Sequence, residues 1–116
     1  MPDWNEQIAL VTGGSGGIGA ACAKRLATCG VSVAVHYHRG ADRAEAVAGE
    51  INASGGNAWT VAADLGDASA VEGMVKGIVE RAGRLDILVN AAGYFQDKLL
   101  GFMTPEDWDA MLRANL

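Results

Sequence analysis

The sequence predicts an α/β fold with a doubly wound parallel sheet. Short apolar runs alternate along the chain with longer stretches in which apolar residues recur at every third or fourth position. The first pattern is typical of buried strands and the second of amphipathic helices. A glycine-rich turn follows the first run and precedes the first helical stretch. Strands that alternate with helices in this order form right-handed βαβ units, and their sheet is parallel.

The composition indicates one folded domain. The chain has 116 residues, of which 50% are hydrophobic and 20% are charged, and this balance argues against disorder. Its 16 glycines do not indicate collagen, because there are only 2 prolines and no three-residue period. The net charge of -5 argues against binding to a nucleic-acid backbone. We therefore expect a single core.

We expect a cytoplasmic protein with no membrane segment and no metal site. No apolar run approaches the roughly 18–20 residues that span a bilayer. The first ten residues include Asp3 and Glu6 and show no signal-peptide pattern. Cys22 and Cys29 lie two turns apart on one expected helix, too far for a disulfide within it. Both are expected to be small buried apolar side chains in a reducing environment.

Four strands are expected, at residues 8–11, 31–35, 59–63 and 85–89. The helix after the first strand should bury a stripe that ends before Gly30, formed by Ile18, Cys22, Leu26 and Cys29. The helix after the second strand should end at Gly55 and Gly56, and its apolar face comprises Ala44, Val47, Ala48 and Ile51.

Two further helices are expected. Ser69 and Glu72 have capping-box spacing at the start of the third, and Gly83 should end it. Thr104 and Pro105 are typical of an N-cap and first helical position, and they open a last helix. Residues 94–103, between the fourth strand and this helix, could form a functional loop.

The glycine-rich turn, residues 12–19, reads TGGSGGIG and contains five of the 16 glycines. It fits the dinucleotide pattern with Gly14, Gly16 and Gly19, and a narrower one with Gly13, Gly17 and Gly19. A helix N-terminus there offers unpaired N–H groups and a partial positive charge to a pyrophosphate. A Walker loop is excluded because alanine, not lysine, follows residue 19. The alternative is a tight turn without a ligand.

Residues 12–19 together with Asn90-Ala-Ala-Gly93 resemble the short-chain dehydrogenase/reductase family. Residues 97–100 and 103–116 most resemble its 3-oxoacyl-(acyl-carrier-protein) reductases, and acetoacetyl-CoA reductases share that stretch. The resemblance covers the chain from Ile8 to Leu116. It implies an NAD(P)-binding Rossmann fold and transfer of a hydride to or from a carbonyl or alcohol carbon.

The resemblance also implies roles for residues at the ends of three strands. Asp64 would bind the adenine amino group, although it could instead be a solvated acid or a helix cap. The implied pyrophosphate contacts are Gly13, Ser15, Gly17, Ile18 and Gly19, with Ile18 contributing a backbone amide. The remaining implied cofactor contacts are Leu65 beside the adenine, and Asn90, Ala91 and Gly93 at the ribose and nicotinamide.

The end of the second strand predicts NADP(H) rather than NAD(H). NAD-preferring folds place an acid there to bind the ribose 2′-hydroxyl, and this chain has Tyr37. Arg39 follows, and a guanidinium can bind a 2′-phosphate with two hydrogen bonds. One departure is Gly16, where some relatives carry a basic residue. Arg39 could also be a solvent-facing loop residue. His36 and His38 are interpreted as strand-end residues, with contact to the phosphate as the lesser alternative.

Asn115 lies seven residues after Trp108, on the apolar stripe of the last helix with Met111 and Leu112. A buried carboxamide is costly unless it is hydrogen-bonded, so a structural core asparagine is one interpretation. The resemblance implies the family's catalytic asparagine, which links the catalytic lysine to solvent through a bound water.

The family's catalytic serine and Tyr-x-x-x-Lys pair would lie beyond Asn115. Tyr94 and Lys98 have the right spacing, which we interpret as coincidence because they lie on a loop. We expect residues 1–116 to be an NAD(P)-binding Rossmann domain truncated after the fourth strand and the following helix, and inactive alone. Strand order 3-2-1-4 would then leave the fourth strand at an edge.

The expected function is NADPH-dependent reduction of a 3-oxoacyl thioester, as in fatty acid biosynthesis. The substrate would be a small molecule or a carrier-bound acyl group, and the resemblance implies a homotetramer. One alternative is a non-catalytic nucleotide-binding module. Another is an oxidoreductase of the same family that acts on acetoacetyl-CoA, a sugar or a steroid.

Overall fold

The computed structural model describes residues 4–14 and 16–91. It confirms the alternation of strands and helices. The elements in chain order are η1 (Trp4–Glu6), β1 (Ile8–Thr12), α1 (Gly17–Thr28), β2 (Ser32–Tyr37), α2 (Ala41–Ala53), β3 (Ala58–Ala62), α3 (Ala68–Ala82) and β4 (Ile87–Asn90). The segment 94–103 and the predicted last helix lie outside the described residues.

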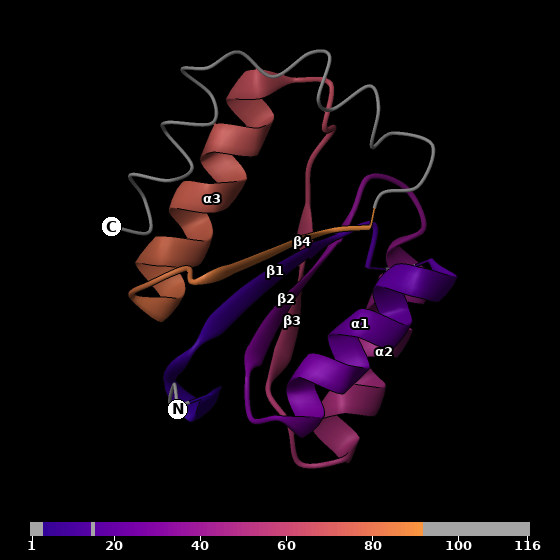
Figure 1. Ribbon diagram of the computed structural model, residues 1–116. Helices are drawn as coiled ribbons and strands as arrows, with labels where there is room; N and C mark the ends of the chain where they lie inside the picture. Colours follow the sequence, from indigo (N-terminus) through magenta and orange to yellow (C-terminus); the bar gives the residue numbers. More distant parts are fainter. Residues whose placement is uncertain (1–3, 15, 92–116) are drawn as a thin grey trace.

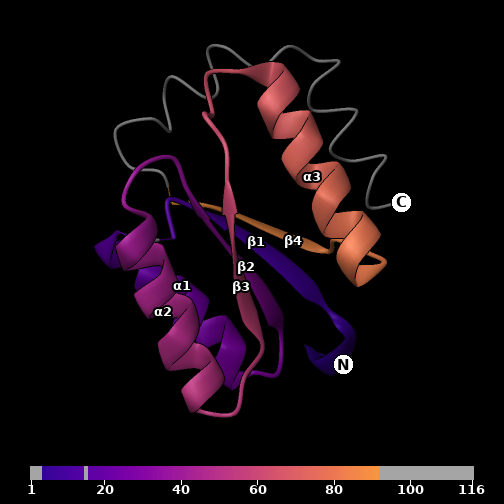
Figure 2. The ribbon, with the colours of Figure 1, turned by 180° about the vertical axis from the view of Figure 1, so that it is seen from behind.

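All four strands are parallel and follow the predicted order, β3-β2-β1-β4. Helices α1 and α2 cover one face of the sheet and α3 covers the other, as Figures 1 and 2 show from opposite sides. The register pairs Thr12 with Asn90 and Val11 with Val35. The carboxyl ends of β1, β2 and β4 therefore meet at one edge of the sheet.

Strand β1 has apolar residues on both faces because helices cover both. Leu10 contributes to the core beneath α3, and Val11 to the core beneath α1 and α2. Both side chains are fully buried. This arrangement explains why strand β1 is a continuous apolar run rather than an alternating one.

The predicted buried stripe of α1 is wrong at both ends, while Cys22 and Leu26 in its middle are half-buried and pack against the core beneath α1 and α2. Ile18 is 77% exposed, Cys29 is exposed and Cys22 is half-buried, whereas the buried residues are Gly19 and Ala23. The fully buried positions of α1 are small residues, so a pattern based on larger apolar side chains predicts a face shifted by one residue. Both cysteines carry free thiols, but Cys29 is exposed and Cys22 is only half-buried, although both were expected to be buried.

The predicted glycine positions at the helix ends are confirmed, but the predicted cap at the start of α3 is not. Gly30, Gly55 and Gly83 have positive φ angles at the ends of α1, α2 and α3. The capping box at Ser69 is wrong, because the N-cap is Asp67. Its carboxylate accepts hydrogen bonds from the backbone N–H groups of Ser69 at 3.0 Å and Ala70 at 3.2 Å. Asp67 has the extended backbone conformation typical of an N-cap residue, and its ionised carboxylate is a good acceptor for these N–H groups.

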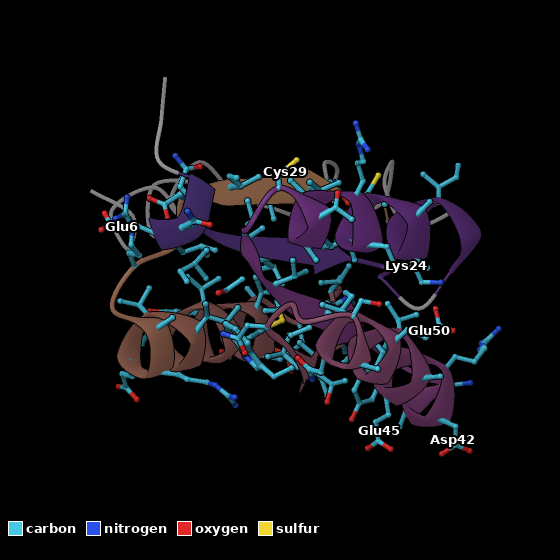
Figure 3. The ribbon with its side chains drawn as sticks, turned by 90° about the horizontal axis from the view of Figure 1, so that it is seen from below. Glu6, Lys24, Cys29, Asp42, Glu45 and Glu50 are labelled. Atoms are coloured by element: carbon cyan, nitrogen blue, oxygen red, sulfur yellow. The ribbon has the colours of Figure 1, made fainter. Side chains whose placement is uncertain are left out.

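Helices α1 and α2 are joined on their outer side by an ion pair between Lys24 and Glu50. Figure 3 shows these two side chains extending from the two helices, while Asp42 and Glu45 project away from α1. The pair is largely exposed, and exposed ion pairs contribute little to stability. The contact between α1 and α2 therefore depends on their apolar residues.

The start of β4 is tied to the start of β1 by Asp86. Its Oδ2 accepts a hydrogen bond from the Ile8 N–H at 2.9 Å, and its own N–H donates to the Ile8 carbonyl at 2.9 Å. Burial disfavours the carboxylate, but the hydrogen bonds from Arg84 and Ile8 outweigh it and lower the pKa of Asp86. Leu85, predicted to be in the strand, instead packs in the core beneath α3.

Replacing Asp86 with asparagine should lower the free energy of unfolding by about 1 kcal/mol, because an ionised acceptor makes the stronger hydrogen bond. The folded-state pKa of Asp86 lies below its unfolded value of 3.8, so its contribution is present above that value and is lost as the pH falls through the folded pKa. Urea unfolding between pH 7 and pH 2 would measure it. A variant with the wild-type acid dependence would contradict this assignment.

Candidate functional site

The candidate site lies where the strand order reverses. Strand β1 connects through α1 to β2 on one side and pairs with β4 on the other. In open α/β sheets, ligands bind in the crevice beyond the carboxyl ends of the strands at such a switch point. The glycine-rich turn leaves β1 at this place, so the predicted motif lies where a ligand is expected.

Two glycines of the turn allow its tight packing. Gly13 has φ of 67°, a left-handed conformation that favours glycine. A Cβ on Gly19 would lie 2.2 Å from the Gly13 carbonyl oxygen and 2.9 Å from Gly14 Cα, both rigid backbone atoms. Gly14 itself lies against Val35 of β2. A side chain at residue 19 would therefore push α1 away from β1.

The N-terminus of α1 is open to a ligand. Its N-cap, Gly16, contributes no side-chain hydrogen bond, and the first turn has no acidic residue. Gly16, Gly17 and Ile18 are exposed, and a Cβ on Gly17 would meet no atom within 4 Å. Backbone N–H groups without side-chain caps, at the positive end of a 12-residue helix, are suited to an anion.

Thr12 joins the glycine turn to the end of β4. Its side chain is buried, and its hydroxyl donates to Asn90 Oδ1 at 2.8 Å. The Ala91 N–H donates to the Thr12 carbonyl at 3.1 Å. These bonds hold the Asn90 carboxamide and Ala91, two of the predicted cofactor residues, beside the turn.

The predicted residues after β2 lie on the same edge. Tyr37 is half-buried at the end of the strand and Arg39 is exposed in the loop that follows. Arg43 was not among the residues predicted from the sequence. A Cβ on Gly40 would lie 3.0 Å from Nη2 of Arg43, so that guanidinium lies against the loop that contains Arg39. The signal available in the sequence was an arginine in the first turn of the next helix.

The residues after β3 differ in how they can contact a ligand. Asp64 is exposed, and its Oδ1 accepts a hydrogen bond from the Gly66 N–H at 2.9 Å. Leu65 is buried in the core beneath α3. Any contact of Leu65 with a cofactor would therefore be through its backbone. Asp64 supports its own turn, and its second carboxylate oxygen remains an available acceptor.

His36 lies near the end of β2, as interpreted from the sequence, and it is also a buried link between two turns. Its Nδ1 lies 3.0 Å from the Gly13 nitrogen and its Nε2 lies 2.9 Å from the Ala63 carbonyl oxygen. Burial lowers the pKa of His36, against a raising effect of the Ala63 hydrogen bond and with a smaller lowering effect of His38. A histidine within a β-branched, apolar strand was the signal that sequence reasoning could have used.

The predicted site residues Ser15, Gly93 and Asn115 lie outside the described part of the chain, as do Tyr94 and Lys98, whose spacing we interpreted as coincidence. Within residues 4–14 and 16–91, no helix is long and apolar enough to cross a membrane. The same residues include no group of three or more histidine, cysteine, aspartate or glutamate side chains that could hold a metal ion.

Comparison with known proteins identifies the family. The sequence model of the short chain dehydrogenase family matches residues 7–116, which is nearly the whole chain. The protein belongs to the short-chain dehydrogenase family. This family of oxidoreductases accounts for the glycine-rich turn and for the sheet order together.

Individual relatives agree with this assignment. The chain is 44% identical to a 3-oxoacyl-[acyl-carrier-protein] reductase of a Synechocystis species over 116 residues, which are 100% of this chain and 47% of that protein. Among solved structures, a variant short-chain dehydrogenase/reductase of Serratia marcescens matches with a TM-score of 0.82 and 36% identity, covering 98% of this chain and 53% of the other.

A short chain dehydrogenase of Burkholderia cenocepacia, solved in complex with NADP, matches with a TM-score of 0.75 and 45% identity, covering 97% of this chain and 46% of the other. The chain thus spans about half the length of these short-chain dehydrogenases.

Replacing Gly19 with alanine should destabilise the protein by about 1–3 kcal/mol, because the added methyl group overlaps rigid backbone of Gly13. Gly17→Ala is the matched control, since its methyl group would enter open space. Urea unfolding of both variants would measure the difference. Equal stability of the two variants would show that α1 does not depend on the close approach.

Proposed function

We propose that the protein is the cofactor-binding part of an NADPH-dependent oxidoreductase that reduces the 3-keto group of an acyl thioester. The observation that carries the proposal is the glycine turn at the switch point of the sheet, followed by a helix whose N-cap, Gly16, makes no side-chain hydrogen bond. We extend the proposal to residues 1–116 as one NAD(P)-binding Rossmann domain.

The residues around the turn suit a dinucleotide. Gly13, Ser15, Gly17, Ile18 and Gly19 would surround the pyrophosphate. Ile18 is exposed and lies between two glycines, so a phosphate oxygen could reach its backbone N–H without meeting a neighbouring side chain. The missing Cβ atoms allow the ligand to approach the helix axis, where the partial positive charge is largest.

The ends of β2 and β3 would hold the adenosine. Asp64 would accept a hydrogen bond from the adenine amino group, with the backbone of Leu65 beside it. Tyr37 occupies the place of the acid that would bind a 2′-hydroxyl, so an added 2′-phosphate would not be repelled. Arg39, with Arg43 near it against Gly40, would neutralise that phosphate.

The end of β4 would border the nicotinamide. Asn90, Ala91 and Gly93 are assigned there, with Asn90 oriented by the Thr12 hydroxyl. The bound cofactor supplies the hydride. We assign Asn115 as the catalytic asparagine that connects the proton-donating residues to solvent.

The substrate class is supported by the 3-oxoacyl-[acyl-carrier-protein] reductase of Synechocystis, and NADP is supported by the Burkholderia short chain dehydrogenase solved with that nucleotide. We therefore favour an acyl thioester, carried on a protein or a small molecule, in a homo-oligomer. A family oxidoreductase for another carbonyl compound, or a nucleotide-binding module without chemistry, is the competing function.

Arg39→Ala should weaken NADPH binding about tenfold and leave NADH binding unchanged, because a charge-assisted hydrogen bond to the 2′-phosphate is lost. Arg43→Ala should have a smaller effect of the same sign. Arg25→Ala, in the last turn of α1 and away from the loop, is the control. Fluorescence titration with both nucleotides would test this, and tighter NADH binding that Arg39→Ala does not change would contradict the NADP assignment.

The reductase activity is tested by following NADPH oxidation with 3-oxoacyl thioesters, a sugar ketone and a ketosteroid, using the chain extended to the length of its relatives. We expect turnover only with the thioesters. The 116-residue chain alone should bind NADPH without oxidising it, and measurable turnover by this chain would show that the catalytic tyrosine and lysine are not required.

A further inference from the structure

The ring of His36 contacts two turns of the candidate site that are far apart in the sequence. One nitrogen lies 3.0 Å from the backbone nitrogen of Gly13, in the glycine turn after β1. The other lies 2.9 Å from the carbonyl oxygen of Ala63, the residue before Asp64. His36 is 2% exposed, so water does not replace either partner.

These contacts determine which tautomer is present. A carbonyl oxygen only accepts, so Nε2 must carry the proton that bonds to Ala63. A backbone N–H only donates, so Nδ1 must be the acceptor from Gly13. A second proton on the ring would place two donors 3.0 Å apart, at Nδ1 and the Gly13 nitrogen. The arrangement therefore exists only with a neutral ring.

The backbone of His36 strengthens the same link. Its carbonyl accepts from the Gly14 N–H at 3.0 Å, so one residue holds two successive amides of the glycine turn. The neighbouring Tyr37 carbonyl accepts from the Ala63 N–H at 3.2 Å. The residue before Asp64 is thus held to the end of β2 through both its N–H and its carbonyl group.

We propose that His36 is a positioning residue that sets the glycine turn and Asp64 at the spacing a dinucleotide needs, and that nucleotide binding requires its ring to be neutral. The inference rests on the proposed function for its ligand, the adenine nucleotide, and on the hydrogen bonds alone for the link itself. Protonation of Nδ1 would remove the acceptor for the Gly13 N–H and release the pyrophosphate turn, whereas Nε2 would still donate to the Ala63 carbonyl, so the spacing between the two turns would no longer be fixed.

Protonation of the His36 ring depends on the titratable groups on the segments around it. The described residues of the glycine turn carry no titratable side chain. Tyr37 ends β2, the loop after it carries His38 and Arg39, and the segment after β3 carries Asp64 and Asp67. Of these groups, His38 acts on the ring through its charge, and it lowers the pKa of His36 together with burial.

Two variants separate the two contacts. Asparagine places its Oδ1 as many bonds from Cα as Nδ1 of histidine, so His36→Asn retains an acceptor for Gly13 and loses Ala63. Glutamine places its Nε2 where histidine has Nε2, so His36→Gln retains a donor to Ala63 and loses Gly13. Neither side chain titrates. His38→Gln, on an exposed neighbour, is the matched control that keeps the ring.

The test is the dissociation constant of NADPH for the purified protein, measured by calorimetry between pH 8 and pH 5. The 2′-phosphate itself gains a proton near pH 6, so each protein is compared with the His36 variants at the same pH. At pH 5, wild type and His38→Gln should bind NADPH about fivefold more weakly relative to those variants than at pH 8, the equivalent of one hydrogen bond. Affinity that is unchanged or rises as the ring gains a proton would overturn the proposal.

Nuclear magnetic resonance gives a readout that needs no nucleotide. Ring nitrogen shifts should show the Nε2–H tautomer at pH 8, and the backbone amides of Gly13 and Asp64 should titrate together with the His36 ring. In His36→Gln this shared titration should vanish. If Gly13 and Asp64 do not follow the ring, the link is wrong. If they do follow it but no nucleotide binds at pH 8, the proposed function fails while the link stands.

Discussion

The arrangement of the site depends on the contact between Gly19 and the backbone of Gly13. Helix α1 starts directly above the turn that leaves β1, and a single methyl group at residue 19 would overlap the Gly13 carbonyl. Because the first turn of α1 lies so close to the end of β1, its first N–H groups are at the carboxyl edge of the sheet. Ala23, one turn later, packs into the core. The helix position, its buried face and its exposed first turn all follow from this contact.

A second constraint comes from the polar side chains at the strand ends. Thr12 and His36 are buried, and burial of polar groups is costly unless each is hydrogen-bonded. Thr12 is paired with Asn90 on β4, and His36 with Gly13 and Ala63 on either side of β2. These bonds join β1, β2, β3 and β4 at one edge, so the loops that leave the strands are held before any ligand arrives.

Membership of the short-chain dehydrogenase family and the described fold support each other. The matched relatives are about twice as long as this chain, and the residues matched by the family model, 7–116, include the glycine turn. A cofactor site built from strand ends needs only the first βαβ units to present its phosphate and adenine contacts. A chain of about half the length of its relatives can therefore contain the residues on which nucleotide binding would depend.

Local patterns in the sequence determined the order of strands and helices, the glycine turn and the left-handed glycines at helix ends, because each depends on neighbouring residues. Tertiary structure decided the rest. Cys22 and Cys29 appeared to belong to the buried face of α1, but the sheet selects Gly19 and Ala23 because close packing favours small side chains. His36 contacts Gly13 and Ala63, which are distant in the sequence and are brought to it only by the sheet. Asp67 and Arg43 contact near neighbours, but these contacts depend on the local backbone conformation, which the periodicity of apolar residues does not specify.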